Sequence, residues 1–149
     1  METSTVMDTP AKFYTNYTHL GYMAGLQGQT PDPKLERSDE YATGWLHGSE
    51  DRAAGITAER FQEHPANLKR GSMVKIPKGT TVSTIYHGVR QAGRDYLVKI
   101  HDVYPVVPAH LDYRRTFSRP TPARVIWPGK GGYWSEAAVT DVVVESEAS

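Results

Sequence analysis

The sequence predicts an α+β protein, with an N-terminal hairpin of two helices followed by a small five-stranded antiparallel β-barrel. Two observations carry this prediction. Residues 20–52 repeat glycine at helical spacing on both sides of a turn that contains two prolines. From residue 72 onward, the pattern changes to short runs of Val, Ile, Tyr and Thr separated by glycine-containing turns. We expect a hairpin with a flexible N-terminus over residues 1–56, a linker over 57–71, the barrel over 72–145 and a tail over 146–149.

The first helix is predicted to begin at Thr9 and Pro10, which supply an N-cap hydroxyl and a proline at the first helical position. It is expected to end near Gly28, before the prolines of the turn 30–33. One apolar stripe at helical period is expected to face the core. Its members are Phe13, Tyr17, Leu20 and Ala24.

The second helix is predicted to start near Ser38, because a serine followed by two acidic residues favours a helix N-terminus. Gly55 is expected to end it as a C′ glycine. Glycine inside a helix costs roughly 1 kcal/mol relative to alanine, so this spacing indicates places where two backbones approach closely. The helix-packing residues predicted in this way are Gly21, Gly25, Gly28, Gly44, Trp45 and Gly48.

Five strands are predicted in the second half, over residues 72–77, 80–87, 95–104, 122–127 and 138–145. Residues 88–94 and 128–132 are expected to be turns, and residues 105–121 form the longest irregular connection. Five short strands with glycine turns favour a small twisted barrel over a βαβ unit.

The 149 residues carry no net charge and no cysteine, which excludes disulfides and thiolate metal sites. The charge is nevertheless uneven. Residues 1–70 hold seven Lys and Arg against ten Asp and Glu, whereas residues 71–149 hold ten against seven. The basic residues concentrate in the segment 86–130, which favours a contact surface there.

The hairpin resembles the ribosome modulation factor family in GYMAGLQG, the proline turn and YATGWLHGSEDR. The matching positions are Gly21, Tyr22, Ala24, Gly25, Gly28, Gly44, Trp45, Gly48, Asp51 and Arg52. The founding member is strongly basic and binds ribosomal RNA, while this hairpin is acidic. The second half is similar to an SH3-like barrel. Hairpins of this kind joined to small barrels resemble accessory proteins of bacteriophages, so the resemblance implies such a role, in the host cytoplasm if the chain is phage-encoded.

Two groups of residues are predicted to bind a partner. The basic loop offers guanidinium groups that could contact phosphate, and the turn around PGKGG places aromatic rings beside cations. The predicted residues are Arg114, Arg115, Arg119, Arg124, Lys130, Tyr133 and Trp134. The alternatives are a solvated loop and structural tryptophans. We expect Trp127 to be buried at the end of the barrel. Trp134 could be either an exposed partner-binding residue or a buried structural one, and both alternatives stay open.

The sequence favours a binding protein over an enzyme. It has no Gly-x-Ser-x-Gly elbow, no Walker loop and no HExxH spacing, so we expect no catalytic residues, metal or cofactor. His87, His101 and His110 with Asp102 and Asp112 form the one conceivable metal set. No apolar run is long enough to span a bilayer, so we expect a soluble cytoplasmic protein with no membrane partner.

Two hypotheses for function stay open. The first is a non-enzymatic binder of RNA or a ribonucleoprotein such as the ribosome, favoured by the basic second half. The second is a protein–protein interaction module that docks on a host protein as an inhibitor or on a virion component during assembly, favoured by the acidic hairpin. The sequence predicts no oligomeric state.

Overall fold

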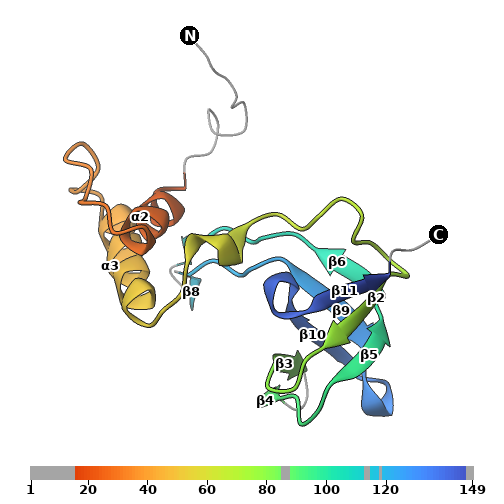
Figure 1. Ribbon diagram of the computed structural model, residues 1–149. Coiled ribbons are helices and arrows are strands. Elements are labelled where there is room, and N and C mark those ends of the chain that lie inside the picture. The colour runs from red at the N-terminus through yellow and green to blue at the C-terminus, as the bar shows by residue number, and fades with distance from the viewer. Residues whose placement is uncertain (1–15, 85–87, 113–114, 118, 147–149) are drawn as a thin grey trace. The chain divides into compact units, whose positions relative to one another are not determined.

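The computed structural model describes residues 16–84, 88–112, 115–117 and 119–146. The α+β class is confirmed, with two packed helices followed by antiparallel sheets (Figure 1). The chain divides into two compact units. Unit 1 comprises Met1–Ala58 and Pro108–Pro120, and unit 2 comprises Glu59–Val107 and Thr121–Ser149. Residues 108–120, predicted as a connection inside the barrel domain, therefore group with the helices.

Unit 1 is built around helices α2 (Tyr17–Leu26) and α3 (Asp39–Ala53). The predicted start of α3 is confirmed, because the Ser38 side chain accepts a hydrogen bond from a backbone N–H in the first turn. Gly55 follows the end of α3 with φ +94°, as expected for a C′ glycine. Helix α2 begins one residue after its N-cap, Asn16, and the start signal at Thr9 and Pro10 lies outside the described residues.

The two helices pack through their glycines. Four of these glycines each face a main-chain carbonyl of the other helix: Gly21 faces Tyr41, Gly25 faces Trp45, Gly44 faces Thr18 and Gly48 faces Tyr22. A Cβ atom at any of these positions would overlap that carbonyl oxygen. Gly28 has φ +74°, and a Cβ there would lie 2.8 Å from the Arg52 guanidinium carbon. The close approach that the glycine spacing predicts is therefore confirmed.

The apolar stripe predicted for α2 is buried only at Ala24 among the described residues, and Phe13 lies outside them. Tyr17 and Leu20 are 38% and 47% exposed. The buried face instead consists of Thr18, Gly21, Tyr22, Ala24, Gly25 and Leu26. The physical reason is that backbone contact between the helices requires small residues at the centre of the interface, which displaces the larger apolar side chains to its margin.

Aromatic rings connect the helices to each other and to the turn between them. The Tyr22 hydroxyl donates to Asp51 (2.6 Å), the Asp32 N–H donates to the Tyr41 hydroxyl (3.1 Å), and the Trp45 indole donates to the Gln29 carbonyl (2.9 Å). Tyr22 and Tyr41 are buried. These bonds satisfy polar groups that burial would otherwise leave without a partner.

A short β-hairpin completes unit 1, formed by β7 (His110–Asp112) and β8 (Arg115–Phe117). Ala109 precedes it, is fully buried and donates its N–H to Nδ1 of His19 at 3.1 Å. Burial of His19 lowers the pKa of its imidazole, which favours the neutral ring that this bond requires.

Unit 2 has eight strands among the described residues, where the sequence predicted five. A five-stranded sheet has the order β4-β3-β10-β9-β6, and a three-stranded sheet has the order β11-β2-β5. The strands are β2 (Met73–Ile76), β3 (Thr81–Thr84), β4 (Gly88–Gln91), β5 (Tyr96–Lys99), β6 (Asp102–Tyr104), β9 (Arg124–Pro128), β10 (Trp134–Ala138) and β11 (Val143–Ser146). The 3₁₀ turns are η1 (Ala58–Phe61), η2 (Lys130–Gly132) and η3 (Val139–Asp141).

The three extra strands are β4, β6 and β10, and the first two have identifiable causes. The predicted strand 95–104 bends at Ile100, so that β5 pairs with β2 in one sheet and β6 pairs with β9 in the other. Strand β4 lies in a segment predicted as a turn, because all four of its residues are exposed at a sheet edge and lack an apolar pattern. Among the described residues of unit 2 the strands form two sheets, and no single closed barrel is present.

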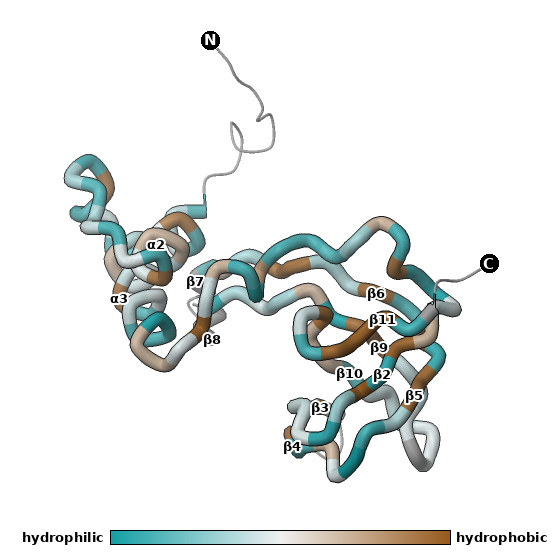
Figure 2. Tube along the Cα trace, in the orientation of Figure 1, coloured by the Kyte–Doolittle hydropathy of each residue, from teal (hydrophilic) through white to brown (hydrophobic). Residues whose placement is uncertain are grey.

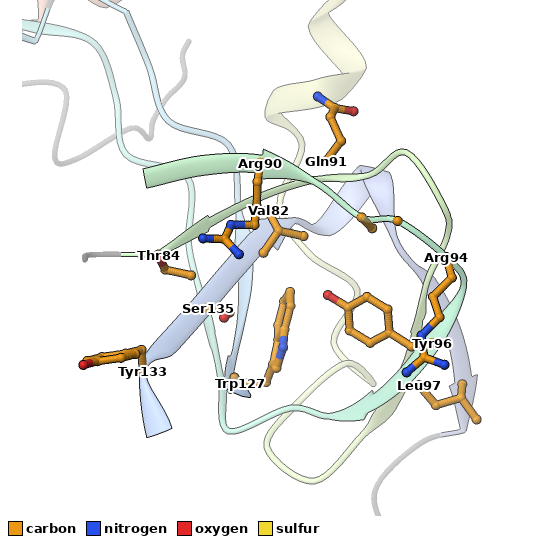
Figure 3. A pocket seen from close by; sticks show the side chains of 13 residues that line it. Val82, Thr84, Arg90, Gln91, Arg94, Tyr96, Leu97, Trp127, Tyr133 and Ser135 are labelled. Carbon is orange, nitrogen blue, oxygen red and sulfur yellow. The ribbon is translucent and has the colours of Figure 1, made fainter. Parts of the chain in front are cut away.

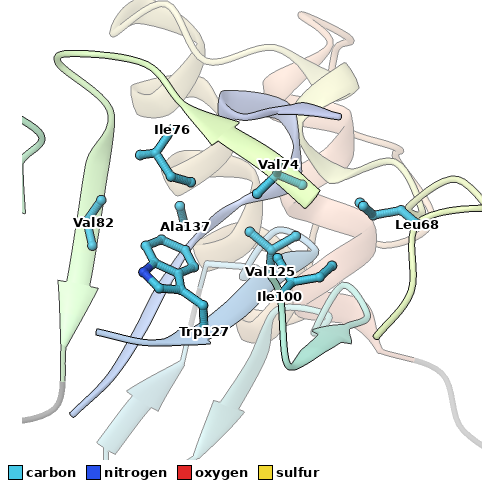
Figure 4. Close-up of a cluster of buried hydrophobic side chains, with 8 residues drawn as sticks. All are labelled: Leu68, Val74, Ile76, Val82, Ile100, Val125, Trp127 and Ala137. Atoms are coloured by element: carbon cyan, nitrogen blue, oxygen red, sulfur yellow. The ribbon is translucent and has the colours of Figure 1, made fainter. Parts of the chain in front are cut away.

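The core of unit 2 lies where the two sheets meet. Its buried side chains are Leu68, Val74, Ile76, Val82, Ile100, Val125, Trp127 and Ala137 (Figure 4). Both β9 and β11 contain hydrophobic stretches (Figure 2). Trp127 is 3% exposed, which confirms its predicted burial. Leu68, inside the segment predicted as a linker, is also buried and anchors that segment to unit 2.

Candidate functional site

Unit 2 contains an open groove of about 740 Å³, here called the arginine groove. This volume lies in the range of roughly 300–1,000 Å³ that is typical of ligand sites. The groove lies between the β3–β4 hairpin, the segment 92–97 and the adjoining ends of β9 and β10 (Figure 3). It is lined by Val82, Thr84, Arg90, Gln91, Ala92, Gly93, Arg94, Tyr96, Leu97, Trp127, Gly129, Tyr133 and Ser135.

Aromatic rings form the middle of the groove, and two arginines lie at its rim (Figure 3). Trp127 lines the groove although it is only 3% exposed, and Tyr96 also lines it and is half-buried. Burial raises the pKa of the Tyr96 hydroxyl, so the phenol stays protonated and can donate a hydrogen bond at neutral pH. The walls thus combine aromatic rings with hydrogen-bond donors.

The electrostatics of the groove favour an anion. Arg90 and Arg94 are both exposed, and no acidic side chain is among the lining residues. Within the described part of the chain, no ion pair joins either arginine to a carboxylate. Both guanidinium groups are therefore available to a ligand, and each could bind a phosphate or a carboxylate through two parallel hydrogen bonds.

Local backbone geometry places Tyr133 at one end of the groove. The turn after β9 is held by the Gly129 N–H, which donates to the Tyr133 carbonyl at 2.7 Å. A Cβ at Gly129 would overlap the Ser135 hydroxyl, while Gly131 has φ +79° and Gly132 has φ +82°. Glycine is required at these positions because other residues rarely adopt positive φ or fit so close an approach. The glycines of PGKGG therefore shape the turn that presents Tyr133.

The predicted partner-binding residues do not all belong to one unit. Arg124, Lys130, Tyr133 and Trp134 are in unit 2, and Arg114, Arg115 and Arg119 are in unit 1. Arg114 and the side chains of Arg115 and Lys130 lie outside the described residues. Tyr133 lines the arginine groove, whereas Trp134, the next residue in β10, lines a different hollow.

Arg119 makes ion pairs inside unit 1. Its guanidinium donates to Glu50 at 2.7 Å and to Asp51 at 3.1 Å. Asp51 also accepts the Tyr22 hydroxyl, so one carboxylate connects both helices to the chain that follows β8. In this arrangement Arg119 holds residues 108–120 against the C-terminal part of α3, where Glu50 and Asp51 lie. The sequence did not indicate this structural role.

Of the residues that line the groove, only Tyr133 was predicted from the sequence as partner-binding, and Arg90, Arg94 and Tyr96 were not. Both arginines lie in the basic segment 86–130, so the charge pattern indicated the region. Their pairing with aromatic rings was not visible, because residues 90–96 and 127–133 come together only through the packing of separate strands.

The sequence also led to predictions about a metal site and a membrane-spanning segment. Among the described residues, no group of three or more His, Cys, Asp or Glu side chains could hold a metal ion, and no described helix is long and apolar enough to cross a membrane. His87, from the one conceivable metal set, lies outside the described residues.

Comparisons with models of protein families, with curated proteins and with solved structures find no match for this chain.

Proposed function

We propose that this chain is a non-enzymatic accessory protein of the bacteriophage type that binds RNA or a ribonucleoprotein through unit 2. The observation that carries the proposal is the arginine groove, in which aromatic rings lie beside two arginines with no carboxylate in the lining. Single-stranded nucleic acid needs this combination, because cations contact its phosphates and aromatic faces stack with its unpaired bases. An A-form duplex would bury those base faces, so an unpaired stretch of RNA is the better fit.

The proposed architecture joins a hairpin like that of ribosome modulation factor to an SH3-like barrel. The helix packing through glycines supports the first part. The bend between β5 and β6, which carries one segment from the three-stranded sheet into the five-stranded sheet, supports the second. The 3₁₀ turn η3 likewise leads the chain from β10 in the five-stranded sheet to β11 in the three-stranded sheet.

The proposal is tested by titrating a labelled single-stranded RNA with the full chain and with the double variant Arg90→Ser/Arg94→Ser at two salt concentrations. We expect the double variant to bind more weakly and to reduce the salt slope by about 0.7 for each lost phosphate contact. The matched control is Lys78→Ser/Lys99→Ser, which removes the same charge from exposed positions of unit 2 outside the groove. An equal loss in both double variants would mean that net charge, and not the groove, governs binding.

The alternative function is docking on a host protein or a virion component, and one feature favours it. Strand β4 is an edge of the five-stranded sheet, and Val89 within it is 68% exposed. An unpaired edge of this kind can accept a strand from another protein. If the wild-type chain shows no affinity for single-stranded RNA at physiological salt, the RNA proposal is wrong and this alternative takes its place.

A further inference from the structure

A second aromatic surface lies on unit 2 beside β10, whose Ser135 lines both this surface and the arginine groove. It surrounds a hollow of about 310 Å³ lined by His101, Tyr104, Ile126, Trp134, Ser135 and Glu136. We call it the Trp134 platform. Trp134 is 45% exposed and Tyr104 is 41% exposed, so two large rings face solvent where smaller residues would suit a strand equally well.

The exposed rings are held in fixed positions. The ring of His101 lies 4.6 Å from that of Trp134, centroid to centroid, at an interplanar angle of 46°. Arg70 in turn fixes His101, because its Nε donates to the His101 carbonyl at 2.9 Å and its Nη2 lies 3.2 Å from the imidazole Nε2. Trp134 thus rests against a supported ring.

Tyr104 is supported in the same way from the other side of the hollow. The Arg124 guanidinium lies over its ring, 5.4 Å from the centroid, and pairs with Glu136 at 3.1 Å. Asp102 belongs to the same strand as Tyr104, and its carboxylate accepts the N–H of Val103. The platform therefore has two basic residues nearby, Arg70 and Arg124, and two acidic residues, Asp102 and Glu136, so its local charge is balanced.

We propose that the Trp134 platform is a second stacking position for one unpaired base of the same single-stranded RNA, an inference that rests on the proposed function. Ordered aromatic rings offer π faces at low cost in conformational entropy, and base stacking tolerates a neutral surface. Glu136 lines the hollow and can accept a hydrogen bond from an exocyclic amino group, so adenine or cytosine fits better than uracil.

The platform is continuous with the arginine groove through the chain itself. Tyr133 and Trp134 are consecutive, yet Tyr133 lines the groove and Trp134 lines the platform. A strand that leaves the groove at Tyr133 and passes over the turn 129–133 reaches Trp134 next. The inference therefore predicts that the binding site is longer than the groove alone, and that the platform contributes to the affinity of long oligonucleotides only.

The test compares oligoadenylates of about four and about ten nucleotides, lengths within the range that single-strand-binding folds cover. We expect Trp134→Ala to weaken binding of the longer oligonucleotide roughly 5- to 100-fold and to leave binding of the shorter one unchanged. Trp134→Phe should restore most of the loss. The control is Tyr17→Ala, which removes an aromatic ring of similar exposure from unit 1.

Tryptophan fluorescence supplies a second measurement on the unaltered protein. Trp127 is buried in the core and Trp45 belongs to unit 1, so Trp134 is expected to dominate the quenching by a base on the platform, and the signal of Trp134→Phe gives the background from the other two tryptophans.

The outcomes separate the two proposals. If Trp134→Ala binds the longer oligonucleotide as tightly as the wild type while Arg90→Ser/Arg94→Ser binds it weakly, the platform is not a base site and the groove stands. Failure of the wild type to bind either oligonucleotide overturns both proposals.

Discussion

Replacement of Gly44 by alanine tests the packing of the two helices most directly. The added Cβ would overlap the Thr18 carbonyl oxygen and lie 2.9 Å from the Tyr22 nitrogen, where ordinary contact is 3.4–4 Å. These atoms belong to the backbone of α2, so they cannot turn aside as a flexible side chain would. The helices must therefore separate by at least about 0.5 Å along this contact, which loosens the packing at the other glycines as well.

The expected loss of stability follows from two opposing terms. Overpacking of a tight interface costs typically about 1–3 kcal/mol, and a clash with backbone belongs at the upper end of that range. Alanine regains about 1 kcal/mol of helix propensity relative to glycine. The net loss is about 2 kcal/mol, which lowers the urea midpoint of unit 1 by about 1–2 M if its m-value is near 1 kcal/mol/M. Gly44→Leu should prevent the hairpin from folding.

Urea unfolding followed by circular dichroism at 222 nm measures this change, because the helical signal comes mainly from unit 1. The matched control is Gly93→Ala in unit 2. No atom lies within 4 Å of a Cβ added there, and the backbone of Gly93 is not in the left-handed region. Equal midpoints for Gly44→Ala and the wild type would refute the reasoning that the helices meet through their backbones.

Three further predictions concern other contacts. Arg119→Ser should lower the stability of unit 1 by about 1 kcal/mol, since it removes the ion pairs that Arg119 makes with Glu50 and with Asp51, and a thermal melt that matches the wild type would contradict this. The lowered pKa of His19 means that the unfolded chain binds the proton more readily, so the stability that His19 contributes should be present above pH 6.5 and fall as the pH decreases below it. Urea midpoints of the wild type and of His19→Gln at pH 8 and pH 5 measure this effect. Parallel changes in the two proteins would exclude His19 as the cause. Trypsin should cut slowly at Lys69 and Arg70, because buried Leu68 fixes this segment to unit 2, and rapid cleavage there would indicate that the segment is a linker after all.

The sequence predicted the helical hairpin well because its signals are local. The cap at Ser38, the glycine after α3 and the spacing of helix glycines each depend on residues within one or two turns. It did not predict the buried face of α2, because small residues form that face, whereas a stripe of larger apolar residues is the usual sign of a buried helix face. Which face is buried depends on how near the second helix comes, and that distance is a property of the pair.

The strands were predicted less completely, for a physical reason that is visible at β4 and at Ile100. An exposed edge strand such as β4 has no apolar alternation to reveal it, and its pairing with β3 supplies the structure. A bent segment such as 95–104 has an unbroken strand pattern, although its two halves bond to different partners. Pairing between strands is non-local, and no single run of residues contains it.

What the sequence determined by itself is the class of the fold, the glycine contact between the helices, the burial of Trp127 and the basic character of the region 86–130. The tertiary structure alone decided that residues 108–120 join the helices, with Arg119 paired to Glu50 and Asp51. It also decided that Arg90, Arg94 and Tyr96 line one groove with Trp127. Helix caps and glycine spacing act between near neighbours in the chain, whereas a groove is assembled by strand pairing and core packing between segments that are distant in sequence.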